Sequence, residues 1–222
     1  MLIAGLDEAG RGCVIGPMAI AGILVDDDGL RKLIEIGVKD SKTLSPEARS
    51  QLANEIRALA LDYHVVLIQP CEIDRAVALG ALNKLEARVM AQIIDRLKPE
   101  VAYVDASDVV EERFALIIRS FLRSARDIRI ISEHEADARY PAVAAASILA
   151  KVERDKAIRE IEASLGVEIG SGYPSDPRTL RFLRDWYARN RSFPDFVRRS
   201  WRTAKEIASE LGRTTLDRWY DK

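Results

Sequence analysis

Two adjacent carboxylates, Asp7 and Glu8, end an apolar run at the start of the chain and precede the glycine-flanked Arg11. The run Met1–Leu6 predicts a short buried strand, and carboxylates at a strand end can hold a hard divalent cation through oxygen. Glycines allow close backbone approach to a ligand, and the arginine fork matches a phosphate. This combination indicates metal-assisted chemistry on nucleic acid, although a capped turn with two solvated acids is the more ordinary explanation of the dipeptide taken alone.

Two further acids could complete such a site. Asp105 closes a second apolar run, and Asp137 precedes the small-residue stretch Ala142–Leu149, which reads as a buried helix that becomes amphipathic further on. Capping is the alternative explanation for Asp137, because a carboxylate is favoured near a helix start. Two strand ends and one helix start could nevertheless bring four carboxylates together. Such a cluster repels itself and needs cations to be stable near neutral pH.

The elements that must position these residues alternate between strand and helix patterns. Ser45 and Pro46 carry the cap and first-turn signals of a helix start. Asp26–Asp28 is expected to be a polar hairpin or a strand-to-helix turn, not a metal site. The pattern predicts an α/β fold with a mixed sheet. The expected strands are 1–6, 18–25, 63–69, 101–104 and 128–131, and the expected helices include 46–61, 82–97 and 111–123.

The composition is that of an ordinary globular protein. The chain has 222 residues, of which 48% are hydrophobic and 31% charged, so it fits one sizeable domain with an appendage. No apolar run is long enough to span a bilayer, and no signal-like segment precedes the first strand. The two cysteines have no paired-ligand spacing, which favours a reducing, cytoplasmic location. We expect no membrane partner, and a monomer.

The C-terminal part of the chain is basic, whereas the rest is acidic. From Arg178 onward there are 12 basic and six acidic side chains, interleaved with aromatics. A basic module beside an acidic body suits a phosphate backbone and metal ions, although a solvated helical face gives the same pattern. Most of the aromatics are expected to form the core of a small helical subdomain. The glycine- and proline-rich segment 166–177 predicts a boundary between residues 1–177 and 178–222.

Five blocks of the chain resemble type 2 ribonuclease H, the ribonuclease HII family, in the family's order. The resemblance covers most of the chain, and Ser200–Thr203 is similar to the archaeal and eukaryotic branch. It implies a ribonuclease H-like, mixed five-stranded sheet flanked by helices, with a small C-terminal helical subdomain. The blocks are Gly5–Gly12, Asp40–Lys42, Asp105, Ala136–Lys151 and Gly170–Pro177.

The resemblance assigns the chemistry. It implies that Asp7, Glu8, Asp105 and Asp137 are the catalytic carboxylates and the ligands of two Mg²⁺ or Mn²⁺ ions. It further implies an endoribonuclease that cleaves the RNA strand of RNA–DNA hybrids and cuts at ribonucleotides embedded in duplex DNA, leaving 3′-hydroxyl and 5′-phosphate ends. The alternatives are a related-fold nuclease acting on DNA junctions and a non-catalytic nucleic-acid-binding or clamp-associated subunit.

The substrate contacts also follow from the resemblance. The 2′-hydroxyl that separates RNA from DNA is expected to be sensed by Tyr173 and the backbone of Gly10, Arg11 and Gly12, unless Tyr173 merely packs beside Pro174. Phosphate contacts are expected from two other residues, Lys42 and Ser147. Lys151 is expected to be structural, and His134 either supports the site or lies at the surface.

The C-terminal tail resembles the motif by which replication proteins dock on the sliding clamp PCNA. Leu216, Trp219 and Tyr220 have the apolar and aromatic spacing of that motif. The glutamine that normally opens the motif is replaced by Arg213, so one polar anchor is missing. The alternative is a terminal turn whose aromatics pack onto the last helix.

Overall fold

The computed structural model describes residues 1–39, 45–124 and 127–220, with side chains as far as residue 212. The predicted phosphate contact Lys42 lies outside the described residues. Internal contacts divide the chain into two units, which are described separately below. Unit 1 comprises Met1–Ala9, Ala19–Leu67 and Ala81–Glu153, and unit 2 comprises Gly10–Met18, Ile68–Gly80 and Arg154–Lys222. The boundary after residue 177 stays a prediction.

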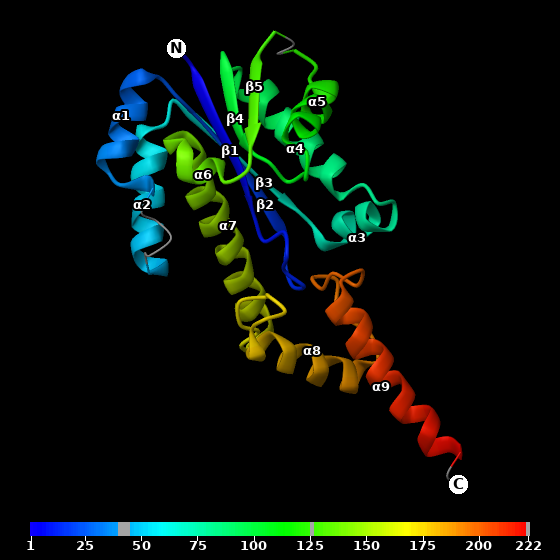
Figure 1. Cartoon of the computed structure of the whole chain (residues 1–222). Coiled ribbons are helices and arrows are strands. Elements are labelled where there is room, and N and C mark those ends of the chain that lie inside the picture. The colour runs from blue at the N-terminus through cyan, green and yellow to red at the C-terminus, as the bar shows by residue number, and fades with distance from the viewer. Residues whose placement is uncertain (40–44, 125–126, 221–222) are drawn as a thin grey trace. The chain divides into compact units, whose positions relative to one another are not determined.

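A mixed five-stranded sheet forms the centre of unit 1 (Figure 1). β1 pairs with β2 in antiparallel fashion and with β4 in parallel, and β4 pairs in parallel with β5. The order β3-β2-β1-β4-β5 therefore confirms the predicted mixed sheet. The strands are β1 (Ile3–Ala9), β2 (Met18–Val25), β3 (Asp62–Ile68), β4 (Val101–Asp105) and β5 (Arg129–Glu133).

The two faces of this sheet are covered by different helices. α1 (Asp27–Glu35), α2 (Pro46–Leu59) and the first part of α7 (Pro141–Leu165) share one buried apolar cluster with β1 and β2. On the other face, α4 (Leu82–Leu97) packs on β1 and on α5 (Glu111–Phe121). Figure 1 shows α1 and α2 on one side of the sheet and α4 and α5 on the other. β1, the central strand, is buried by helices on both faces.

Most predicted elements agree with the structure to within two residues, and β2 and α4 agree fully. The polar segment expected as a turn contains instead the start of α1. Asp26 caps this helix by accepting a hydrogen bond from the Gly29 amide at 2.8 Å, and the acids that follow lie in its first turn, where the helix dipole favours them. The extent of this helix was not predicted because its cap and first turn carry two further acids and a glycine after Asp26.

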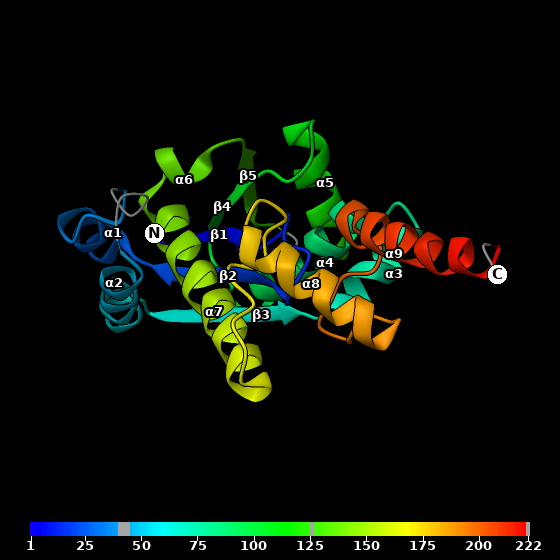
Figure 2. The same ribbon diagram turned by 90° about the horizontal axis from the view of Figure 1, so that it is seen from below.

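Unit 2 has its own apolar core. It gathers side chains from the second half of α7, from the loop after β1, and from α8 and α9, which pack together (Figure 2). In the part of the chain that the structure describes, no helix is long and apolar enough to cross a membrane. The remaining helices are α3 (Pro70–Ala78), α6 (Ala136–Arg139), α8 (Pro177–Asn190) and α9 (Arg202–Tyr220).

Candidate active site

The carboxylates of unit 1 meet where two neighbouring parallel strands run side by side. The ladder between β1 and β4 pairs Leu6 with Val104, so Asp7 and Asp105 are the next residues on each strand. Residues in register on neighbouring strands project from the same face of a sheet. The register therefore places the Asp7 and Asp105 side chains together on one face.

Asp7 is the most buried of the four predicted carboxylates, at 5% exposure. Burial raises its pKa well above the ordinary aspartate value, and the negative charges of Glu8 and Asp105 raise it further. The Ser147 hydroxyl of α7 and the Glu8 amide, 2.7 Å from Asp7 Oδ1, donate hydrogen bonds to the carboxylate. Lys151 Nζ in turn donates to Ser147 Oγ at 2.8 Å. Asp7 is thus held in place by neutral donors and crowded by negative charge.

Asp105 links Asp7 to the fourth carboxylate. Its Oδ1 accepts a hydrogen bond from the Ala136 amide at 3.2 Å, and this places the start of α6 beside the end of β4. Partial burial raises the pKa of Asp105, and the charge of Asp137, in the first turn of α6, adds to the rise. The three aspartates therefore form a chain of mutually repelling charges.

Glu8 takes a different direction from Asp7. β1 was expected to end at Leu6, but it continues regularly to Ala9, with Glu8 paired to Ile20 of β2. Because successive side chains of a strand point to opposite faces, Asp7 projects toward α7 and Glu8 toward the face that carries α4. The two acids still interact electrostatically. If β1 ended before Asp7, the two carboxylates could lie side by side. Because the strand continues, they do not.

The chemistry of this acidic cluster suits a hard divalent cation. The donors are all carboxylate oxygens, which Mg²⁺ and Mn²⁺ prefer, and a cation would relieve the repulsion that raises the pKa of Asp7. Among the described residues, no three His, Cys, Asp or Glu side chains form a ready-made metal cluster. Because Glu8 projects to the other face of β1, its side chain would have to turn to reach an ion held by Asp7.

The glycine–arginine–glycine segment and Tyr173 lie close together within unit 2. Gly10 and Gly172 both have positive φ, at 82° and 77°. A Cβ on Gly172 would lie 2.7 Å from Arg154 Nη2, and one on Gly10 would lie 3.1 Å from Arg154 Cγ. Both glycines are therefore needed for their backbone conformation and for the space that Arg154 fills. A Cβ on Gly12 would lie 4.0 Å from the Tyr173 ring, which places the two predicted sugar-sensing groups next to each other.

Tyr173 is firmly positioned although it is 38% exposed. The guanidinium of Arg154 lies over its ring at 4.9 Å and donates to the Ser171 carbonyl and to Cys13 Sγ. Burial of the hydroxyl, together with its hydrogen bond to Cys13, raises the pKa of Tyr173 to about 12. The hydroxyl is consequently a neutral hydrogen-bonding group at any physiological pH, as recognition of a sugar hydroxyl requires.

The sequence analysis did not identify two residues, Arg154 beside Tyr173 and Glu133 beside Asp105. Arg154 is 4% exposed, and only its position, one turn beyond the matched helix block, could have drawn attention to it. Glu133 was also missed, although it pairs with Asp105 in the β4–β5 ladder. Its Oε2 accepts from Arg139 Nη1 at 2.7 Å, so Glu133 is occupied by an ion pair at the edge of the acidic cluster.

Two residues whose roles the sequence left open have clear contacts. Lys151 bonds to Ser147, as described above, which agrees with a structural role. The His134 side chain is exposed, and its backbone amide donates to Glu111 Oε1 at 2.6 Å. The structure thus places His134 at the surface, where its positive form would act on Asp105 only electrostatically. The role of Ser147 as a phosphate contact stays a prediction.

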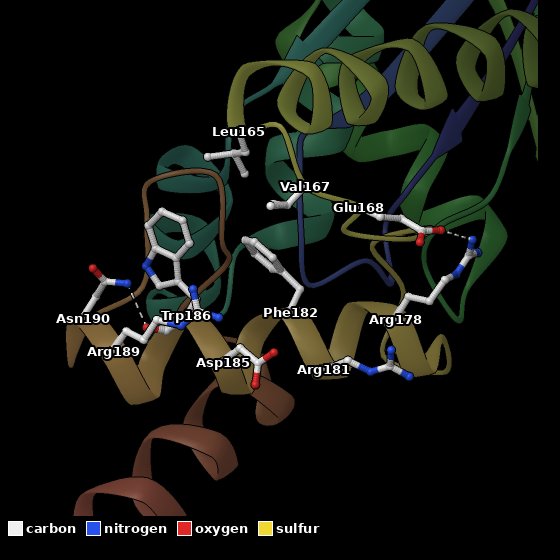
Figure 3. A pocket seen from close by; sticks show the side chains of 10 residues that line it. All are labelled: Leu165, Val167, Glu168, Arg178, Arg181, Phe182, Asp185, Trp186, Arg189 and Asn190. Atoms are coloured by element: carbon white, nitrogen blue, oxygen red, sulfur yellow. Dashed lines mark hydrogen bonds and ion pairs between the residues drawn. The ribbon is translucent and has the colours of Figure 1, made fainter.

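A cavity of about 490 Å³ lies within unit 2 between α8 and the end of α7 (Figure 3). Phe182 and Trp186 point into it from α8, and Arg178 at its rim is paired with Glu168 at 2.7 Å. Most C-terminal aromatics pack on the core of this unit, which confirms the predicted structural role for Phe182, Tyr187, Phe193, Phe196 and Trp201.

A mixed five-stranded sheet with acidic residues on its central parallel strands defines a ribonuclease H-like fold. The family model of ribonuclease HII matches residues 4–204. A ribonuclease HII of Pyrococcus abyssi is 48% identical over 218 residues, which cover 97% of this chain and 95% of the relative. The chain therefore belongs to the ribonuclease HII family, whose members are endoribonucleases that cleave the RNA strand of RNA–DNA hybrids.

Solved structures of related enzymes also resemble the chain. The ribonuclease H2 of Pyrococcus horikoshii has a TM-score of 0.88 at 43% identity and covers 96% of this chain and 99% of its own. A ribonuclease HII of Archaeoglobus fulgidus, solved in complex with PCNA, has a TM-score of 0.83 at 44% identity. The match covers 91% of this chain and 96% of the Archaeoglobus chain. Bst-RNase HIII, solved in complex with Mn²⁺, has a TM-score of 0.81 at 21% identity. The match covers 96% of this chain and 71% of the Bst-RNase HIII chain, and at this identity it supports the fold alone.

Proposed function

We propose that Asp7, Glu8, Asp105 and Asp137 form the cleavage site, with Mg²⁺ or Mn²⁺ as the cofactor. The observation that carries this proposal is the buried, crowded Asp7 carboxylate beside Asp105. Two bound divalent ions would supply an activated water and stabilise the leaving oxyanion. Metal dependence is general in the ribonuclease H family, and the Mn²⁺ complex of Bst-RNase HIII is consistent with this choice.

The residues around the carboxylates have positioning roles in this proposal. Ser147 fixes the rotamer of Asp7 by its hydrogen bond, and Lys151 orients the Ser147 hydroxyl. The Ala136 amide holds Asp105 at the start of α6, which keeps Asp137 nearby. Asp7 and Asp105 are thus anchored by backbone amides and by a neutral hydroxyl, which leaves their negative charge available for cations.

Specificity for ribose is assigned to unit 2. The backbone at Gly10, Arg11 and Gly12, together with the Tyr173 hydroxyl, would sense the 2′-hydroxyl of the nucleotide to be cut. The support is that these groups adjoin one another and that Arg154 holds the Tyr173 ring. The substrates would be RNA–DNA hybrids and duplex DNA with single ribonucleotides, and cleavage would leave 3′-hydroxyl and 5′-phosphate ends.

A second proposed interaction concerns the sliding clamp. The similar Archaeoglobus fulgidus enzyme was solved in complex with PCNA, and Leu216, Trp219 and Tyr220 carry the spacing of a clamp-docking motif. These three residues lie on the last part of α9, beyond the described side chains. Because Arg213 replaces the usual glutamine, the proposed interaction is a weak one.

The experiment that tests the cleavage proposal compares two duplexes that differ by one ribonucleotide. With Mg²⁺, the protein should nick the duplex that carries the ribonucleotide and leave the all-DNA duplex intact, and chelation should stop the reaction. End-group analysis should show a 3′-hydroxyl and a 5′-phosphate. Equal cutting of both duplexes would favour a DNA nuclease, and binding without cutting would favour a non-catalytic subunit.

A further inference from the structure

The loop that follows β1 is held through its carbonyl oxygens by a short C-terminal segment of unit 2. Arg198 Nη1 donates to the Arg11 carbonyl at 2.8 Å and Arg198 Nε donates to the Gly16 carbonyl at 3.1 Å. The indole Nε1 of Trp201 donates to the Gly12 carbonyl at 3.2 Å. Residues nearly 190 positions apart in the chain thus share these hydrogen bonds.

Arg198 is completely buried, with 0% exposure. Burial lowers its pKa to about 10, and the nearby charge of Arg154 lowers it as well. A buried guanidinium is costly unless hydrogen bonds compensate for its lost hydration. Here the compensation comes from the carbonyls of the loop and from the Trp201 ring, which lies 4.9 Å from the guanidinium carbon.

The contact with the Arg11 carbonyl determines where one amide of the loop points, whereas the Gly12 carbonyl held by Trp201 belongs to the peptide whose Cys13 amide closes a turn onto the Gly10 carbonyl at 3.2 Å. A peptide unit is planar and trans, so its C=O and N–H groups point in opposite directions. When Arg198 holds the Arg11 carbonyl toward the buried side, the Gly12 amide must point away from that side. Gly12 is exposed, so this amide faces the surface next to Tyr173.

We infer that Arg198 and Trp201 are positioning residues for ribose recognition: Arg198 aims the Gly12 amide by holding the Arg11 carbonyl, and Trp201 fixes the turn that carries this amide by holding the Gly12 carbonyl. The inference rests on the proposed ribose-sensing role of that loop. Neither side chain touches the substrate in this account. Their contribution is preorganisation, because a loop whose amides are already aimed loses less entropy on binding the sugar.

A purely structural role gives a different expectation. If Arg198 and Trp201 only stabilise unit 2, their loss lowers the melting temperature and reduces cleavage of every substrate by the same factor. If they aim the loop, the loss falls mainly on the substrate that offers a single 2′-hydroxyl. A long RNA–DNA hybrid offers many registers and compensates for a poorly aimed amide.

The test uses the full-length protein and two duplexes, one with a single ribonucleotide and one with a continuous RNA strand. The measured quantity is the ratio of kcat/KM on the first to kcat/KM on the second. Trp201→Phe keeps the ring and removes the indole donor, so this ratio should fall about fivefold, as expected for one lost hydrogen bond. Arg198→Lys removes the simultaneous hydrogen bonds to the Arg11 and Gly16 carbonyls, and the ratio should fall about tenfold or more.

Two matched variants serve as controls. Arg199 is the neighbour of Arg198 but donates to the Phe193 carbonyl, outside the loop, so Arg199→Lys should leave the ratio unchanged. Trp186→Phe, in α8, makes the same chemical change as Trp201→Phe away from the loop and should also leave it unchanged. If Arg198→Lys fails to fold, the comparison between the two tryptophan variants still decides the question.

Tyr173→Phe separates this inference from the proposed function. If Tyr173→Phe lowers the ratio while Trp201→Phe and folded Arg198→Lys do not, the positioning role is wrong and ribose sensing stands. If all three leave the ratio unchanged, ribose sensing by this loop is itself wrong. A fall in all three, with melting temperatures near wild type for Trp201→Phe, supports both.

Discussion

Gly5 of β1 lies directly against the backbone of Ala142 at the start of α7. A Cβ added to Gly5 would be 2.1 Å from the Ala142 carbonyl carbon and 2.4 Å from the Val143 nitrogen. The obstacle is backbone and cannot rotate away, so only glycine permits this approach. Since Asp7 follows two residues later on the same face of β1, this close packing also sets the position of the Asp7 carboxylate against Ser147.

Gly5→Ala should therefore damage both stability and activity. The start of α7 would have to move, and overpacking of this kind costs about 1–3 kcal/mol, or about 2–4 °C in melting temperature for each kcal/mol in a chain of this size. Cleavage should fall more than stability explains, because Ser147 moves relative to Asp7. Gly212→Ala, where an added Cβ meets no atom within 4 Å, is the control: it should leave cleavage unchanged and should not lower the melting temperature, because alanine favours the helix α9 in which it lies. Wild-type activity in Gly5→Ala would contradict the packing argument.

Asp7→Asn should abolish cleavage and stabilise the metal-free protein. The folded-state pKa of Asp7 is raised, so the ionised carboxylate destabilises the fold once the pH rises above the unfolded value of about 3.9. Neutralisation removes this penalty, and we expect a gain of about 2–4 °C, equivalent to about 1 kcal/mol. The gain should be larger at pH 7 than at pH 4.

Thermal unfolding in a chelator, at both pH values, measures this effect. Asp185→Asn, at an exposed position of α8, is the matched control and should leave both the melting temperature and cleavage unchanged. Asp105→Asn should behave like Asp7→Asn, because burial and Asp137 raise the pKa of Asp105 as well. Cleavage within a few-fold of wild type would remove the substituted residue from the mechanism.

Asp108→Asn should make the loop after β4 less stable to heat at neutral pH. Asp108 accepts hydrogen bonds from Arg113, from Asn83 Nδ2 at 3.1 Å and from the Val110 amide at 2.9 Å. The Arg113 guanidinium, followed by the Val110 amide, holds the pKa of this carboxyl well below its usual range. A depressed folded pKa contributes stability above the unfolded value and loses it as pH falls.

The difference in melting temperature between wild type and Asp108→Asn should thus amount to a few degrees at pH 7. It should shrink as the pH falls below about 4, where the unfolded carboxyl takes up a proton. Melting curves from pH 7 to pH 2 test this expectation. A difference that stays constant over that range would show that the carboxylate charge is not what Asp108 contributes.

Deletion of Thr214–Lys222 should abolish binding to PCNA and leave nicking of short duplexes nearly unchanged. Aromatic anchors of this kind often dominate the energy of an interface. Arg213→Gln should tighten binding, since it restores the polar anchor of the motif. Titration of PCNA with the three proteins measures both effects. Equal affinities of the full-length and truncated proteins, or unfolding of the truncation, would assign the tail to the fold itself.

The sequence by itself determined the parts of this protein that depend on local pattern. β2 and α4 follow from short-range hydrophobic periodicity, and the order of the motif blocks indicated the family, from which the four catalytic carboxylates are predicted. The cap at Ser45 placed the start of α2, because a capping side chain acts on an amide only three residues away.

Only the tertiary structure decided the directions and partners of the functional side chains. The continuation of β1 through Ala9 is stabilised by pairing with β2, and this pairing, invisible in the local pattern, turns Glu8 to the face opposite Asp7. The hydrogen bond from Ser147 to Asp7 and the bonds from Arg198 to the loop at Arg11 join residues far apart in the chain. Such contacts arise from packing and not from periodicity, so the sequence pattern carries no direct signal for them.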